Sequence, residues 1–138
     1  MNKQKYNYSG QSLVESVVTL GVVLLLVTGI VVGTTSSLRY AENSKARSTA
    51  TQYAQEGLEL ARNERDAGWS AFAHSGTFCT VPLGSPPPCS PMDSRFTRTL
   101  IYTYDALKKQ VAVQSVVSWI EGGVTKTTTL QTTLTDWK

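Results

Sequence analysis

The sequence has few of the residue types that catalytic and metal sites need. Its 138 residues include one histidine, His74, and two cysteines, Cys79 and Cys89. It has no glycine-rich phosphate loop, no Ser/His/Asp arrangement and no spacing typical of metal ligands. His74 has no acidic or cysteine residues grouped around it, so we interpret it as a loop residue. The sequence therefore predicts no enzyme activity, no metal site and no other cofactor.

Charge is absent from a long stretch near the amino end. No Asp, Glu, Lys or Arg occurs in the 23 residues from Ser16 to Leu38. Of the 20 residues from Leu13 to Val32, 14 are Leu, Val or Ile. A helix of about 20 residues spans about 30 Å, which is the hydrocarbon thickness of a bilayer. The run predicts a membrane-spanning helix over residues 11–38 and leaves residues 39–138 for a water-facing domain.

The distribution of charge predicts the orientation in the membrane and argues against one class of partner. Lys3 and Lys5 precede the apolar run, so the positive-inside rule places the amino end in the cytoplasm. The domain 39–138 is then outside, which suits a cysteine pair that can oxidise. Net charge is +3, but without the first ten residues it is 11 basic against 10 acidic residues, or +1. A broad basic face for nucleic acid is therefore not expected.

A cleaved secretory signal is the main alternative for the apolar run. Such signals also begin with basic residues and continue with an apolar region. The run here is longer than the usual apolar region of about 7–15 residues. The segment that follows, GTTSSLRYAENS, contains no clear small-x-small cleavage site. These features favour a helix that is retained.

Glu15 is the one acidic residue placed in an apolar setting. A carboxylate at the centre of a membrane helix costs about 2.5–3.5 kcal/mol, and less near an end. Glu15 either reaches the headgroups or has a positive partner. If the chain were cut after Gly10, Gln11 would carry a free amino group four positions before Glu15. Positions i and i+4 share a helix face, so this amine could neutralise Glu15 of its own or a neighbouring chain.

The segment Gly10-Gln11-Ser12-Leu13-Val14-Glu15, after a basic leader and before an apolar helix, resembles the processing signal of type IV pilin-like proteins. The resemblance implies that residues 1–10 are a leader that prepilin peptidase removes after Gly10. It also implies methylation of Gln11 and a role for Glu15 in assembly with other pilin-like subunits. The helix would first hold the subunit in the cytoplasmic membrane. With the membrane assembly machinery it would later enter the core of a cell-surface filament.

A second helix is predicted over residues 39–66, continuous with the first. Small and apolar residues recur there at three- and four-residue spacing, at Ala46, Ala50, Tyr53, Ala54, Gly57, Leu58 and Ala61. This stripe predicts an amphipathic helix packed against another element. Gly68 suits a left-handed cap after the helix.

Residues 67–95 are predicted to form a loop. The segment GTFCTVPLGSPPPCSP is incompatible with a helix or a central strand, because proline removes backbone donors and fixes φ. If Cys79 and Cys89 pair, the disulfide closes this loop. The loop is either a stapled surface segment or a displayed recognition loop.

Residues 96–138 predict a three-stranded β-meander. Phe96, Leu100, Tyr102 and Tyr104 share one parity, and Val111, Val113, Val117 and Trp119 share another. Glu121-Gly122-Gly123 is a turn signal before the alternating segment 124–135. The Ala/Leu stripe is the available cover for one sheet face. The fold class is therefore α+β, a long helix with a membrane half and an amphipathic half, and a small antiparallel sheet packed on the latter.

The leading functional hypothesis is a structural subunit: a minor pilin, a pseudopilin of type II secretion or a competence-pilus subunit, which the sequence does not separate. The alternative is a binding or adhesion module held permanently on the membrane, with residues 69–94 as its ligand surface. That alternative needs neither Gly10 nor Glu15, so these two residues separate the hypotheses.

Overall fold

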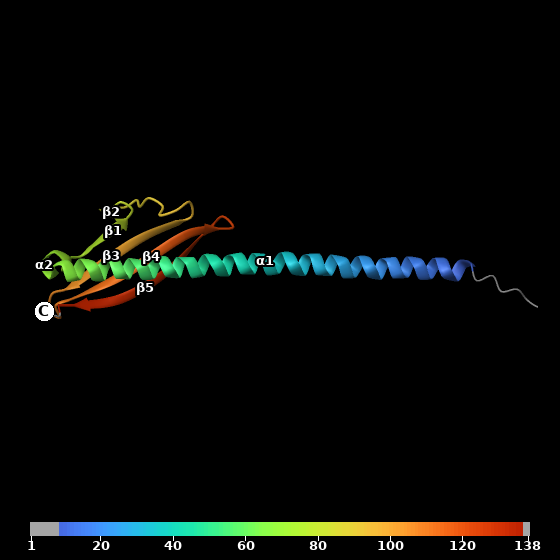
Figure 1. Ribbon diagram of the computed structural model, residues 1–138, viewed down its shortest axis with the longest axis horizontal. Coiled ribbons are helices and arrows are strands. Elements are labelled where there is room, and N and C mark those ends of the chain that lie inside the picture. The colour runs from blue at the N-terminus through green and yellow to red at the C-terminus, as the bar shows by residue number, and fades with distance from the viewer. Residues whose placement is uncertain (1–8, 137–138) are drawn as a thin grey trace, which may run out of the picture. The chain divides into compact units, whose positions relative to one another are not determined.

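The computed structural model describes residues 9–136, with side chains from Ser12 onward. Residues 1–8, which belong to the predicted leader and include Lys3 and Lys5, and residues 137–138 lie outside the described residues. Helix α1 (Ser9–Ala67) is followed by a four-residue helix α2 (Trp69–Phe72) and a five-stranded antiparallel sheet (Figure 1). This confirms the predicted α+β fold. The chain divides into two compact units, one ending at Glu42 and the other beginning at Asn43.

The first unit consists of the amino-terminal part of α1. The helix continues without a break through Gly21, Gly29 and residues 33–37, where the weak helix formers Gly, Thr and Ser are concentrated. Every side chain from Ser12 to Glu42 is exposed. Apolar side chains therefore cover this part of the helix without any protein packed against them.

In the second unit, α1 contributes the predicted stripe to the core. Ala46, Ala50, Ala54, Leu58 and Ala61 are buried, and Tyr53 is half-buried. Small side chains on this face allow the helix to lie close to the sheet. The helix ends at Ala67, one residue beyond the predicted end.

The sheet has the strand order β2-β1-β3-β4-β5. Its strands are β1 (Gly76–Thr80), β2 (Leu83–Ser85), β3 (Phe96–Asp105), β4 (Gln110–Glu121) and β5 (Val124–Thr135). Strands β3, β4 and β5 form the predicted meander. Gly122 and Gly123 join β4 to β5, with φ values of 59° and 78°. Positive φ at both residues of a two-residue hairpin explains why glycine occupies these positions.

Alternation along the strands divides the sheet into a buried face and an outer face. Residues at every second position of β3 and β4 are buried, from Phe96 to Tyr102 and from Val111 to Trp119. Two clusters join this face to α1, one around Leu58, Ala61, Leu100 and Val113 and the other around Ala50, Ala54 and Trp119. The predicted cover of the sheet by the helical stripe is thus confirmed.

The prediction of an irregular loop over residues 67–95 is wrong for its first half. The structure forms α2, β1 and β2 there, and β1 lies inside the sheet between β2 and β3. The five prolines begin only at Pro82, so every residue from Gly76 to Thr80 keeps its backbone donor. Phe78 pairs with Leu100 of β3 in this register. Residues 86–95 are irregular, as predicted.

Candidate functional site

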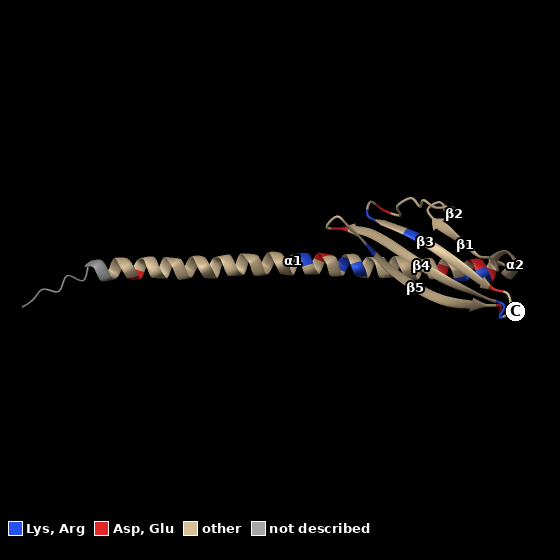
Figure 2. Ribbon diagram, turned by 180° about the vertical axis from the view of Figure 1, so that it is seen from behind, with Lys and Arg blue, Asp and Glu red and all other residues tan. Residues whose placement is uncertain are grey.

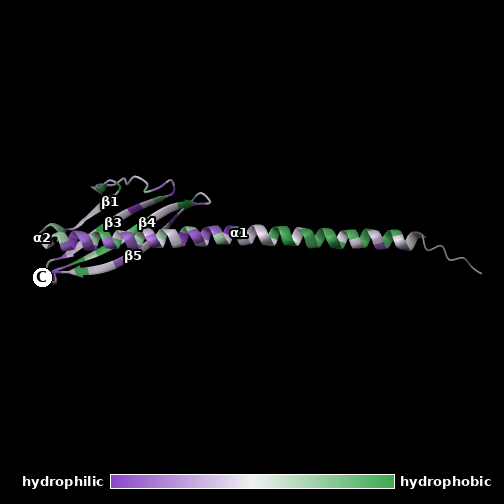
Figure 3. Ribbon diagram, viewed as in Figure 1, coloured by the Kyte–Doolittle hydropathy of each residue, from purple (hydrophilic) through white to green (hydrophobic). Residues whose placement is uncertain are grey.

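The apolar part of α1 is the first candidate for a functional surface. Figure 3 shows hydrophobic residues through most of this part, and Figure 2 shows it free of charge between Glu15 and Arg39. It is the one helix among the described residues that is long and apolar enough to cross a membrane, by length and composition. An apolar surface of this extent is not normally left in contact with water.

Most hydroxyl groups in the apolar segment make hydrogen bonds within the helix itself. Ser16 donates a hydrogen bond to the carbonyl oxygen of Ser12 at 2.8 Å, and Thr28 donates to that of Leu24 at 2.7 Å. Similar bonds are made by Thr19, Thr34 and Thr35. Such internal bonds lower the cost of placing a hydroxyl in surroundings that offer no water. The segment is therefore suited to an apolar environment in spite of its Ser and Thr residues.

Glu15 lies on the exposed surface of α1, at the amino end of the uncharged stretch. No cation contacts its carboxylate among the side chains from Ser12 to Asp136. The backbone of Gly10 and Gln11 is helical, so position 11 lies one helical turn before Glu15. If the chain were cut after Gly10, the amino group of Gln11 would lie on the same helix face as Glu15.

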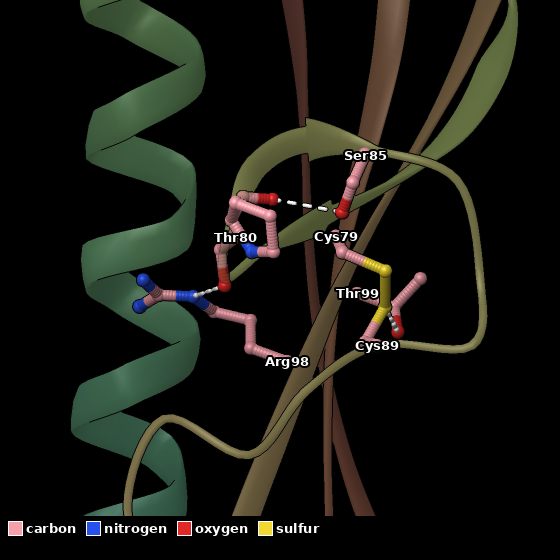
Figure 4. The surroundings of a disulfide bond; sticks show 7 residues. Cys79, Thr80, Ser85, Cys89, Arg98 and Thr99 are labelled. Atoms are coloured by element: carbon pink, nitrogen blue, oxygen red, sulfur yellow. Dashed lines mark hydrogen bonds between the residues drawn. A yellow bond between two sulfur atoms is a disulfide. The ribbon is translucent and has the colours of Figure 1, made fainter.

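Cys79 and Cys89 form a disulfide. Cys79 is buried in β1, and Cys89 lies in the proline-rich segment with its Sγ 3.3 Å from Thr99 Oγ1 of β3 (Figure 4). The bond fixes the irregular segment 86–95 to an interior strand of the sheet. A second attachment follows at Asp93, whose carboxylate accepts hydrogen bonds from the backbone of Arg95 and Phe96 and from the Tyr53 hydroxyl of α1. The Arg95 amide contributes most to the lowered pKa of the Asp93 carboxyl.

These attachments bear on the idea of a displayed recognition loop. The segment 86–95 is held by a covalent bond near its start and by three hydrogen bonds near its end. Pro86, Pro87 and Pro88, which lie just before Cys89, are exposed. The arrangement is a stapled surface segment, which leaves only a short exposed arc of mostly apolar, uncharged residues for any recognition.

Arg98 is a buried cation that sequence reasoning did not identify. It lies on the inward parity of β3, between Phe96 and Leu100, and is 7% exposed. Its guanidinium donates to Thr80 Oγ1 at 3.1 Å and to the Tyr53 carbonyl oxygen at 2.6 Å. A longer contact of 3.4 Å reaches the Glu56 carboxylate. Burial lowers the pKa of Arg98, and Glu56 opposes this shift.

The Arg98 network joins α1 to β1 and β3 rather than forming a reactive centre. Its hydrogen bonds run from β3 to Thr80 of β1 and to Tyr53 and Glu56 of α1, so they hold these elements together. The alternation of residues in β3 could have predicted the burial of Arg98, because the parity that buries Phe96 and Leu100 also buries position 98. A sequence reading that follows only apolar residues passes over it. Among residues 9–136 no group of His, Cys, Asp and Glu is arranged to hold a metal.

Comparison with known proteins finds no matching family model, no similar curated protein and no similar solved structure. The function must therefore be argued from the residues and their arrangement.

Proposed function

We propose that the protein is a pilin-like structural subunit, a minor pilin or a pseudopilin of type II secretion. It is inserted in the cytoplasmic membrane with its amino end inside, cleaved after Gly10 and assembled through its apolar helix. The observation that carries this proposal is a single carboxylate, Glu15, five positions after Gly10 at the entrance of a 23-residue uncharged helical segment.

The apolar segment of α1 has properties that suit two successive environments, first lipid and then a bundle of similar helices. Its length matches a bilayer, and most of its hydroxyls are bonded within the helix, so lipid can surround it. Its apolar side chains are exposed on all faces, so other copies of the same helix can replace the lipid without loss of buried area. The second unit, with its disulfide, stays in water in either state.

Glu15 supports assembly rather than simple anchoring. In lipid the carboxylate lies near the end of the helix, where its cost is small. Inside a bundle of such helices the same carboxylate loses its water, and an unpaired buried charge is strongly destabilising. The amino group formed by cleavage, from its own chain or a neighbour, supplies the opposite charge. A permanent anchor has no use for this pair.

The alternative is an extracytoplasmic binding or adhesion module on an uncleaved anchor. The exposed prolines of the stapled segment 86–95 are the observation that favours it. The two functions differ at the amino end, which mass spectrometry of the protein from its native membrane can determine. We expect a mature chain that begins at Gln11, with or without added methyl groups. A chain that retains Met1–Gly10 contradicts the proposal.

The role of Glu15 is tested by Glu15→Gln, with Glu42→Gln as the matched control on the exposed polar part of α1. Breaking a buried charge pair costs about 3–5 kcal/mol, so incorporation of Glu15→Gln into filaments should fall by about tenfold or more. Its membrane insertion should be unchanged or improved. Quantitative immunoblotting of sheared filaments and of membranes measures both. Incorporation of Glu15→Gln equal to that of Glu42→Gln would show that the carboxylate has no partner.

A further inference from the structure

The second unit contains a cavity of about 370 Å³ that the proposed function does not use. Its walls come from the end of α1, from α2, from the β1–β2 hairpin and from β3. The lining is mostly apolar, with Ala67, Ala71, Phe72, Phe78, Leu83 and Leu100 among its residues. This size and lining lie within the range of sites for small molecules, although at the small end.

Among the described residues, two polar groups of the cavity, the Tyr102 hydroxyl and His74 Nδ1, already donate to protein acceptors. The Tyr102 hydroxyl donates to Glu64 Oε2 at 2.8 Å, so its proton is already used. His74 Nδ1 lies 2.9 Å from the Ala71 carbonyl oxygen and donates to it, so Nε2 is the ring nitrogen that remains for a ligand. The second oxygen of Glu64 has no bonded partner in the part of the chain that the structure describes. A ligand that matches this inventory must supply the donors.

Charge and aromatic rings point to the same ligand chemistry. Glu64 is the one acidic residue of the lining, and no Lys or Arg among the described residues lines the cavity. Phe72 and Phe78 each contact Tyr102, with ring centroids 5.7 Å apart in both pairs. The faces of aromatic rings attract cations, and more strongly where water is excluded.

We propose that this cavity binds a small organic cation, an ammonium group carried on an alkyl or aryl chain. The ammonium donates to Glu64 and His74, and the chain packs against Phe72, Phe78 and Leu83. The disulfide contributes by fixing β1, because Cys79 is part of the cavity wall. The site is independent of cleavage and assembly, since every lining residue lies in the second unit.

The test uses the full chain in detergent micelles and three probes of one shape: phenethylammonium, 3-phenylpropionate and 2-phenylethanol. Binding is followed by NMR through the methyl groups of Leu83 and Leu100 and the ring of His74. We expect saturable shifts with phenethylammonium and binding at least about tenfold weaker for the other two probes, since hydrogen bonds to charged groups contribute about 1.5–3 kcal/mol. Partition of the probes into micelles is the same for every variant and does not saturate.

Two variants and a control make the result specific. Glu64→Gln keeps an acceptor for Tyr102 but removes the charge, and should weaken phenethylammonium binding by about tenfold or more. Glu59→Gln makes the same change on α1 outside the cavity and should bind like the wild type. Should Glu64→Gln not fold, Tyr102→Phe leaves the carboxylate in place and should retain binding.

Three outcomes would overturn the proposal. The first is the absence of saturable shifts at Leu83, Leu100 and His74. The second is equal binding of the ammonium and the carboxylate probe. The third is unchanged ammonium binding by a folded Glu64→Gln protein.

Discussion

At the scale of single residues, the closest contact between helix and sheet is at Gly57. A Cβ atom at this position would overlap Ser115 Oγ and would lie 3.1 Å from Leu100 Cδ2. The Ser115 hydroxyl is fully buried and is the one buried side-chain polar atom without a hydrogen-bond partner among the described residues. Glycine therefore sets the distance between α1 and β4, and Ser115 provides the small residue opposite it.

Gly57→Ala should destabilise the second unit by about 1–3 kcal/mol, because overpacking exceeds the gain in helix propensity. Denaturant unfolding followed by the fluorescence of the buried Trp119 measures this. Ser115→Ala alone should be neutral or stabilising, since it removes an unpaired buried hydroxyl. The double variant should recover most of the loss. Gly29→Ala, where a Cβ meets nothing within 4 Å, is the control. A Gly57→Ala protein as stable as the wild type would disprove the close approach.

Tyr102 makes the stability of the second unit decrease with rising pH in the alkaline range. Burial, and then the hydrogen bond to Glu64, raise the pKa of its hydroxyl above the ordinary value of 10.0. The folded state therefore holds this proton at a pH where the unfolded state has lost it. The resulting stability is present in full below pH 10 and is lost as the pH rises above it. Between pH 9 and 11.5, the free energy of unfolding should fall less steeply for Tyr102→Phe than for the wild type. The two slopes can differ by at most about 1.4 kcal/mol per pH unit, because one proton is involved. Equal slopes would contradict this account.

At the scale of elements, sequence patterns predicted the long helix, its buried stripe and the meander, because each depends on local periodicity. The Gly122-Gly123 hairpin was predictable for the same reason. Strands β1 and β2 were not, because five- and three-residue strands carry almost no periodicity and lie beside prolines. Strand β1 pairs with β3, a contact distant in sequence, and β2 in turn pairs with β1. The cavity of the second unit forms where five elements meet, so local sequence patterns could not predict it.

The β1 element depends on the disulfide more than the longer strands do. Replacing both cysteines by alanine removes a cross-link of an eleven-residue loop, which should cost about 2.5–3 kcal/mol in the chain-entropy model. Thermal unfolding of this variant, compared with the wild type under oxidising conditions, measures the loss. Hydrogen exchange should show the largest increase in β1 and β2 and little change in β4. Uniform loss of protection over the whole sheet would contradict this assignment.

At the scale of the whole molecule, the orientation proposed above depends on the basic residues at the amino end. Lys3→Glu with Lys5→Glu should invert part of the population, because basic residues flanking the apolar segment determine orientation. The Cys79–Cys89 bond then serves as a compartment marker, since inverted chains keep their thiols reduced. Thiol alkylation followed by electrophoresis measures the reduced fraction, which should rise from near zero. Lys108→Glu with Lys109→Glu, in the distant turn after β3, should not change it. If the variant with Lys3→Glu and Lys5→Glu also shows no reduced fraction, the proposed orientation is contradicted.

One feature of the sheet has a consequence for how copies of the protein meet. Strand β5 forms an edge of the sheet and is 12 residues long, without proline. Its one charged side chain, Lys126, is paired in register with Trp119, on the parity that faces α1. Exposed strand edges invite pairing between molecules, and an inward-directed lysine makes such pairing unfavourable. In the assembly proposed above, subunits brought together by their amino-terminal helices would therefore keep their sheets separate.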